Sequence, residues 1–176
     1  MRLKNIVSIA CVACSLLFFA GCYETQYPLG SPDKATVDPG YVGDFVLTDK
    51  DQKSETIIIR NIDNRLYYVE WLSGDDKPLR MVGYTADVNG VTFANLRGLT
   101  DDGTIDDKYM LFRISLSGDH SKLSIRNLKD DFFKNKNINS SETQQKVIAE
   151  NLENSEMYDG DAVTATRVPP APNGLK

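Results

Sequence analysis

The residues TADVNGVTFA, numbers 85–94, form the clearest local pattern in the chain and indicate a β-hairpin. Asn89-Gly90 at the centre favours a two-residue type I′ turn, because both central residues of that turn need a positive φ. The turn sets Val88 opposite Val91, and a shift of one residue would turn the whole apolar face over. The side chains predicted to share that face are Val82, Tyr84, Ala86, Val88, Val91 and Phe93.

A second hairpin is predicted at residues 109–128. Apolar residues alternate with others along its first strand, which is the period of a strand with one buried face. A turn at residues 118–121 sets Leu116 opposite Leu123, so both strands agree on the buried face. The polar stretch 101–107 (DDGTIDD) is the connection that precedes this hairpin.

A third hairpin is predicted at residues 55–72 (ETIIIRNIDNRLYYVEWL), which are rich in β-branched and aromatic residues. Asp63-Asn64 suits a tight turn, because both residues tolerate a left-handed backbone. A two-residue turn at this position pairs Ile59 with Tyr68.

One helix is predicted near residues 141–153. Ser141 and Gln144 have the spacing of a capping box, and Ile148 and Leu152 lie one helical turn apart. A helix of about 13 residues is marginal alone, so we expect it to pack on the sheet.

Two further strands, at residues 41–48 and 162–168, bring the total to seven or eight short antiparallel strands. The predicted fold is therefore all-β with one C-terminal helix. An antiparallel meander of this kind closes into a barrel or a strongly curved sheet, because closure removes unpaired edges. The order of the elements is similar in outline to lipocalin-like barrels, although no lipocalin sequence motif accompanies it.

The first 22 residues have the layout of a secretion signal. Arg2 and Lys4 precede an uncharged apolar run, residues 6–20. This run is shorter than the roughly 20 residues that a transmembrane helix needs. It ends in Phe19-Ala20-Gly21-Cys22, which resembles the lipobox of bacterial lipoproteins, with Phe19 where leucine is usual.

In bacterial lipoproteins a diacylglycerol is attached to the sulfur of the lipobox cysteine, the leader is cut just before it, and the new amine is acylated. The resemblance implies that Cys22 is lipidated, becomes the first residue of the mature protein and anchors it to an envelope membrane. In enteric-type bacteria an aspartate after the cysteine retains a lipoprotein at the inner membrane. Tyr23 stands there, so the outer membrane is expected. The alternatives are an ordinary secretion signal with a coincidental Cys22, or an uncleaved N-terminal anchor.

Loss of the leader would remove Cys11 and Cys14 and leave only the acylated Cys22. No disulfide, catalytic cysteine or cysteine metal site is then expected. Loss of Arg2 and Lys4 would change the net charge from −5 to about −7. An acidic surface disfavours nucleic acid as a partner.

Composition divides the chain into four parts. Residues 1–21 are expected to be the signal peptide, and residues 22–40, with three prolines and two glycines, a lipidated tether. Residues 41–168 form the barrel-like domain, and the proline-rich residues 169–176 a disordered tail.

Five aromatic residues on the predicted strands make up the candidate surface for a ligand or partner: Tyr67, Tyr68, Trp71, Tyr84 and Phe93. Tyr67 and Trp71 share one strand face and Tyr68 lies on the other, so this strand needs cover on both sides. Three interpretations follow: a core on one side with the helix or tether on the other, a cavity for a small apolar ligand, or an aromatic patch for a partner protein.

No catalytic residue, cofactor or metal is expected. His120, the only histidine, falls at a predicted hairpin tip, and no hydrolase or nucleotide-binding motif is present. Residues 101–107 offer hard oxygen ligands, but Asp107 and Arg113 stand where an EF-hand loop needs glycine and glutamate. We interpret this stretch as a solvated acidic loop.

These features favour a membrane-anchored, non-catalytic binding or interaction module of a bacterial envelope, with an envelope protein as its partner. One alternative is a carrier of a small apolar ligand in a barrel cavity. Others are an envelope hydrolase using paired carboxylates and a structural envelope component.

Overall fold

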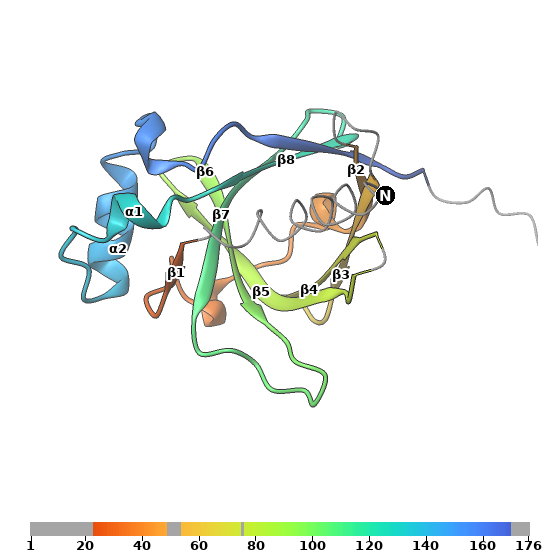
Figure 1. Ribbon diagram of the computed structural model, residues 1–176, viewed down its shortest axis with the longest axis horizontal. Helices are drawn as coiled ribbons and strands as arrows, with labels where there is room; N and C mark the ends of the chain where they lie inside the picture. The colour runs from red at the N-terminus through yellow and green to blue at the C-terminus, as the bar shows by residue number, and fades with distance from the viewer. Residues whose placement is uncertain (1–22, 49–53, 75, 170–176) are drawn as a thin grey trace, which may run out of the picture.

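The computed structural model, which describes residues 23–48, 54–74 and 76–169, is a closed antiparallel barrel of eight strands (Figure 1). Each strand from β2 to β8 pairs with the next along the chain, β8 pairs with β9, and β9 pairs with β2. The predicted all-β fold is confirmed. Of the two expected forms, a barrel or a strongly curved sheet, the structure has the closed barrel. The barrel strands are β2 Gly43–Thr48, β3 Ser54–Asn61, β4 Tyr67–Ser73, β5 Leu79–Val88, β6 Val91–Gly98, β7 Tyr109–Leu116, β8 Lys122–Asn127 and β9 Val163–Arg167.

A ninth strand, β1 Glu24–Thr25, completes the edge of β7. β8 pairs with β7 only from Phe112 onward, so the start of β7 would otherwise have a free edge. β1 pairs with Tyr109 and Met110 on that edge. An unpaired strand edge is a site for aggregation, and β1 covers it.

The connection between β8 and β9 carries the helices α1 Asp130–Phe133, α2 Ser141–Ala149 and η4 Ser155–Met157. α2 is the predicted helix, but it ends four residues earlier than expected. Its capping box is formed by Ser140 and Thr143, one residue before the predicted pair. Gln144 does not cap the helix because its side chain is buried against Tyr23 and Thr25.

The predicted registers of two hairpins are confirmed: Val88 lies opposite Val91, and Leu116 lies opposite Leu123. Asn89 has φ 53° and Gly90 φ 83°, as a type I′ turn requires.

The register predicted for the β3–β4 hairpin is wrong by one residue, because Ile59 pairs with Val69 and not with Tyr68. The turn is longer than expected, since the Asp63 carboxylate accepts hydrogen bonds from the backbone N–H groups of Arg65 and Leu66. Directly opposite residues share a face, and the observed register places two buried side chains together.

Two apolar clusters stabilise the fold. The barrel core fills the interior with side chains from all eight strands; its fully or almost fully buried members include Phe45, Ile57, Met81, Phe112, Leu123 and Ala165. The outer core lies between β5–β7 and the elements packed on their outer face; its members are Tyr23, Leu29, Val88, Phe93, Leu111, Leu128, Phe133, Ile148, Met157 and Tyr158. In Figure 1, α1, α2 and β1 lie together on the left of the barrel.

Residues 23–41, which we call the strap, are packed on the barrel, so the structure corrects the expectation of a tether over residues 23–40. Tyr23, Thr25 and Leu29 are buried. Further along, η2 Pro32–Lys34 and η3 Pro39–Tyr41 lead to an end of the barrel, where Tyr41 joins the barrel core. The predicted signal peptide and most of the predicted tail lie outside the described residues.

An arginine on the last strand holds the end of the strap. Arg167 donates hydrogen bonds to the backbone carbonyls of Gly40, Val42 and His120, and its guanidinium stacks over Phe45 at 4.4 Å from the ring centre. Hydrogen bonds from a charged donor are stronger than neutral ones. This contact therefore links η3 to both β9 and the β7–β8 turn.

Candidate functional site

The five aromatic residues predicted as one surface lie in three different places. Tyr67 and Trp71, on β4, line the barrel interior. Tyr68 lies on the opposite, outer face of β4 and is half-buried. Phe93 is buried in the outer core, and Tyr84 is buried with its ring edge-on to that of Tyr109, so these aromatic residues do not form one exposed patch.

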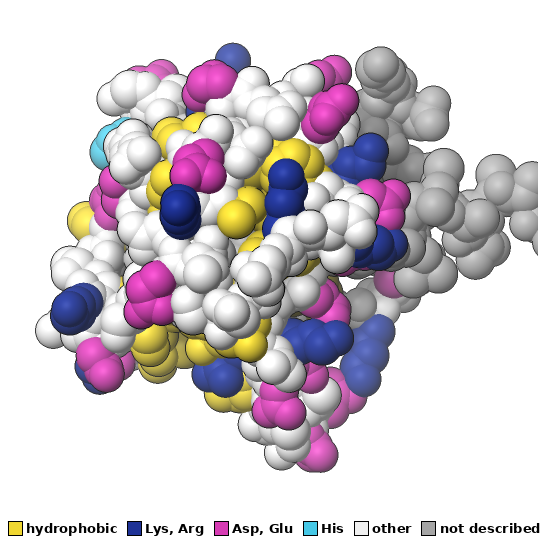
Figure 2. Space-filling model, turned by 90° about the vertical axis from the view of Figure 1, so that its left-hand side faces the viewer, with side chains coloured by type: hydrophobic (Ala, Val, Ile, Leu, Met, Phe, Trp, Pro, Cys, Tyr) yellow, Lys and Arg dark blue, Asp and Glu magenta, His cyan; other side chains and the backbone are white. Residues whose placement is uncertain are grey.

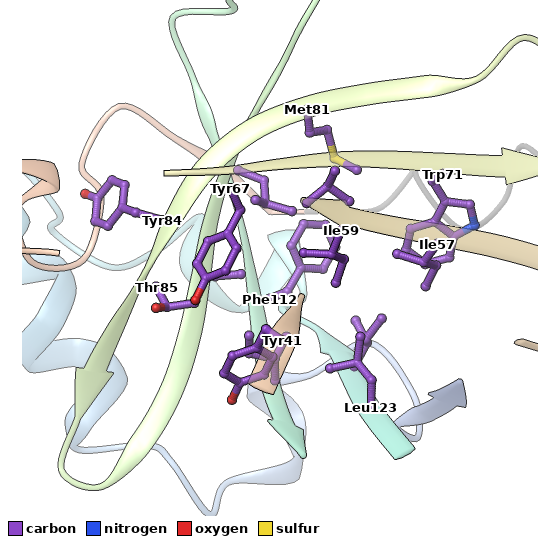
Figure 3. Close-up of a pocket in the computed structure, with 15 residues that line it drawn as sticks. Tyr41, Ile57, Ile59, Tyr67, Trp71, Met81, Tyr84, Thr85, Phe112 and Leu123 are labelled. Atoms are coloured by element: carbon purple, nitrogen blue, oxygen red, sulfur yellow. The ribbon is translucent and has the colours of Figure 1, made fainter. Parts of the chain in front are cut away.

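The barrel interior contains a small cavity of about 60 Å³ (Figure 3). Its wall exposes no polar atom. Figure 3 shows Tyr41, Ile59 and Phe112 grouped around this space, whereas the ring of Tyr84 points away from it. Pockets for small organic ligands usually have about 300–1,000 Å³, so in this conformation the interior is almost filled by its own side chains.

The side-chain polar atoms of Tyr67 and Trp71 have partners at the barrel ends. The Trp71 indole N–H donates to the Glu55 carboxylate at 2.7 Å. The Tyr67 hydroxyl accepts a hydrogen bond from the backbone N–H of Asp38 at 2.6 Å and donates to the carbonyl of the same residue at 3.2 Å. Burial raises the pKa of Tyr67. Both groups are therefore satisfied within the protein and are not held ready for a ligand.

Strands β5, β6 and β7, and not β4, have buried side chains on both faces. Phe93 and Ala94 are adjacent on β6, yet Phe93 belongs to the outer core and Ala94 to the barrel core. We expected the helix or the N-terminal segment to cover the outer face of β4. These elements cover the outer face of the neighbouring β5–β6 hairpin instead. The face shared by Val88 and Phe93 is the outer face, on which the strap and α2 pack.

A second group of residues, which sequence patterns did not reveal as a site, holds the start of the strap. The Tyr23 hydroxyl donates to the Gln144 side-chain oxygen at 2.7 Å, and the Thr25 hydroxyl donates to the same oxygen at 3.3 Å. The Tyr23 ring stacks on Phe133 with ring centres 4.0 Å apart. One signal could have shown this role: Gln144 lies one helical turn before the buried Ile148, on the same face.

Asn95 on β6 holds the strap further along. Its side-chain oxygen accepts from the backbone N–H of Leu29 at 2.7 Å, and its side-chain NH₂ donates to the carbonyl of Leu29 at 3.3 Å. The polar residues classed as buried in the described ranges are Thr25, Asn95 and Gln144, and all three contact the strap or belong to it. A buried polar group without a partner is costly, so these residues favour one position of the strap.

A groove of about 260 Å³ opens beside Tyr23. One side is formed by residues 23–27, and the other by Lys108, Phe133, Lys136 and Ile138. Figure 2 shows the face of the molecule that carries α1, α2 and β1, on which hydrophobic side chains lie among charged ones. The ammonium group of Lys136 lies over the ring of Phe132, 4.6 Å from its centre.

Several carboxyl groups of the described residues have a shifted pKa. Where the pKa of a carboxyl group is shifted, it is lowered, and hydrogen bonds to the carboxylate are the main cause; the groups are Asp63, Asp101, Asp102, Asp119, Asp131 and Glu142. The hydroxyl of Thr100, for example, lowers the pKa of Asp102 to about 2. A general acid at neutral pH needs a raised pKa.

His120 is exposed at the β7–β8 turn with φ 56°, where the sequence predicted it. Over residues 23–48, 54–74 and 76–169, no three His, Cys, Asp or Glu side chains are placed to hold a metal ion.

Comparison of the chain with models of protein families, with curated proteins and with solved structures found no match. In the part of the chain that the structure describes, no helix has both the length and the apolar character needed to cross a bilayer.

Proposed function

We propose that this chain is a lipoprotein of a bacterial envelope, anchored by acyl chains on Cys22. The observation that carries the proposal is the sequence Phe19-Ala20-Gly21-Cys22, which resembles a lipobox and follows a short apolar run. The packing of Tyr23 supports cleavage before Cys22, because a cut further along the chain would remove a buried side chain of the outer core. Two or more acyl chains hold a protein firmly on a bilayer, whereas one chain binds only marginally.

The proposed role of the anchored barrel is non-catalytic binding of another envelope protein, at the outer membrane. Tyr23 after the lipidated cysteine favours the outer membrane. Two observations disfavour the alternatives of a carrier and a hydrolase. The interior cavity of about 60 Å³ is too small for most organic ligands, and the shifted carboxyl groups have lowered pKa values where a general acid needs a raised one.

The anchor is tested by the substitution Cys22→Ala in cells grown with labelled palmitate. We expect the unchanged protein to incorporate the label and to have the mass of a triacylated chain that begins at Cys22. The variant should accumulate as unlabelled precursor. Equal labelling of both proteins, or a natural product with a free sulfur, would refute the assignment.

The binding role is tested by photo-crosslinking in intact cells from exposed positions on the barrel, for example Ile62 and Ile105. A partner that is captured reproducibly from one of these positions, and is lost when Cys22→Ala prevents acylation, would support the role. If a small molecule co-purifies in stoichiometric amount by native mass spectrometry and no protein is captured, the carrier alternative is correct and the proposed role is wrong.

A further inference from the structure

We propose that the barrel lies directly on the lipid surface in one orientation, with the groove beside Tyr23 facing the headgroups. This inference rests on the proposed lipid anchor at Cys22. It adds to that proposal the face of the protein that contacts the membrane, and it names a phospholipid bilayer as the partner of that face.

The first step of the argument is the length of chain between lipid and fold. Cys22 and Tyr23 are consecutive, and consecutive Cα atoms lie about 3.8 Å apart. A flexible tether of 18 residues would let the domain move tens of ångströms from the membrane. With Tyr23 already packed in the outer core, the acyl chains would be attached one residue from the folded surface.

The second step is that Tyr23 is firmly held. Its side chain is only 7% exposed, its hydroxyl donates to Gln144, and its ring stacks on Phe133. Its backbone N–H donates to the carbonyl of Leu128 at 3.3 Å, and β1 begins at the next residue. Because each of these contacts joins Tyr23 to the barrel or its helices, the residue next to the attachment point is held on the domain.

The third step is the chemistry of the face around that point. The groove presents the exposed ammonium groups of Lys108 and Lys136 together with apolar atoms of Ile138. Side chains of this type suit the boundary between phosphate groups and acyl chains. Glu24 forms an ion pair with Lys108 at 3.3 Å, so the short covalent link sets the orientation and charge adds little.

The opposite wall of the barrel provides a control position. In the ring of eight strands β3 lies four strands from β7, the strand that carries β1. Figure 1 shows β3 on the right and β1 on the left. Asn61 at the end of β3 is exposed, as Gln26 and Lys136 are beside the groove.

Cysteine labelling can test the orientation, because acylation of Cys22 and loss of the leader would make any introduced cysteine the only free thiol. Three variants of the full chain, Gln26→Cys, Lys136→Cys and Asn61→Cys, are expressed, purified from membranes and checked for acylation by mass. Each is labelled with a fluorophore and reconstituted in vesicles of phosphatidylethanolamine and phosphatidylglycerol that carry a nitroxide on the headgroup. We expect several-fold stronger quenching at positions 26 and 136 than at position 61.

A matched variant separates the short link from adhesion of the face. Insertion of a flexible Gly-Ser segment of about ten residues between Cys22 and Tyr23 keeps both the lipidation motif and the folded domain, and gives the domain freedom to turn. The difference in quenching between positions 26 and 61 should then disappear. If it persists, the short link does not set the orientation.

The result that would overturn the orientation differs from the result that would overturn the anchor. An acylated protein with equal quenching at all three positions, or with the strongest quenching at position 61, would overturn the orientation and leave the anchor intact. A membrane fraction that contains no acylated protein would overturn the anchor and the orientation together.

Discussion

The barrel core and the outer core are held in different ways. The barrel core is enclosed by a closed ladder of backbone hydrogen bonds, and its cavity wall exposes no polar atom. The outer core joins one side of that ladder to the strap and the helices of the β8–β9 connection, and only the two-residue β1 provides a strand ladder there. Buried side-chain amides, Gln144 and Asn95, hold the strap instead.

This difference indicates where side chains must determine the position of a segment. In a closed barrel the register of each strand follows from its neighbours, so apolar side chains are sufficient in the interior. A strap that crosses the outer face of a sheet has no such register. Hydrogen bonds to the buried amides favour the observed position, because a displaced strap would lose them, although the Gln144 side-chain nitrogen has no partner there among the described residues.

The largest expected effect comes from equal truncations in the two cores. Phe45→Ala in the barrel core and Phe133→Ala in the outer core should each lower the free energy of unfolding by about 3–5 kcal/mol. Hydrogen exchange should differ between them. We expect Phe45→Ala to speed exchange throughout the barrel, and Phe133→Ala to speed it first in α1, α2 and β1, because these elements can open while the ladder stays closed.

Ile62→Ala is the control for these truncations, since Ile62 is 54% exposed, and it should change stability by less than about 0.5 kcal/mol. If Phe133→Ala opens the barrel strands as fast as Phe45→Ala does, the two cores form one cooperative unit and the comparison is wrong.

The next effect concerns the buried amide of α2. Gln144→Met keeps the approximate volume but leaves the hydroxyls of Tyr23 and Thr25 without their shared acceptor, so it should lower the free energy of unfolding by about 1–3 kcal/mol. Adding Tyr23→Phe should recover part of the loss, because one unpaired hydroxyl is then removed. Urea denaturation of the two single variants and the double variant measures this coupling, and strictly additive losses would contradict it.

A smaller effect is expected at the hairpin that both cores share. Replacing Asn89 and Gly90 together by alanine forces two alanines into positive φ, which costs about 1–2 kcal/mol. Denaturation should show this loss, whereas Gly118→Ala should leave stability nearly unchanged, because a methyl group added at Gly118 would have no neighbouring atom within 4 Å. An unchanged stability of the double variant would mean that another turn type forms equally well.

The last effect is confined to alkaline solution. Burial raises the pKa of Tyr41 and Tyr67 in the barrel core, and of Tyr23 in the outer core, above the ordinary value of 10.0. The folded protein therefore holds these protons more tightly than the unfolded chain. The contribution of these tyrosines to stability should be constant with pH below about 10 and fall as the pH rises further.

Denaturation at several pH values, together with tyrosinate absorbance, measures this loss. Tyr67→Phe should reduce the slope above pH 10, because it removes a hydroxyl whose pKa is raised by burial. A slope equal to that of the unchanged protein would show that burial of Tyr67 does not contribute.

Much of the fold could be predicted because it depends on near neighbours in the chain. The alternation of apolar residues and the turn at Asn89-Gly90 predicted the strands and two registers, and a barrel or a strongly curved sheet was expected because closure removes unpaired edges. The β3–β4 register was not predictable because Asp63 bonds to two backbone N–H groups and lengthens the turn, an interaction that composition alone does not distinguish from a tight turn.

The candidate site was less predictable, because both faces of β5 and β6 are apolar. A period-2 pattern shows that Phe93 and Ala94 point to opposite sides, but it does not show which side is the interior. The strap has the composition of a tether for a similar reason: its prolines and glycines indicate an extended chain, and an extended chain can be free or packed.

Local features could be inferred from the amino-acid sequence: which segments are strands, where two of the hairpins turn, and which cysteine ends a lipobox-like motif. The tertiary structure was needed to assign the inside and outside of the barrel, to place Tyr23 against Gln144, 121 positions away, and to separate the aromatic residues into different surroundings. The physical reason is that strand and turn preferences act over a few residues, whereas burial depends on which distant segments meet.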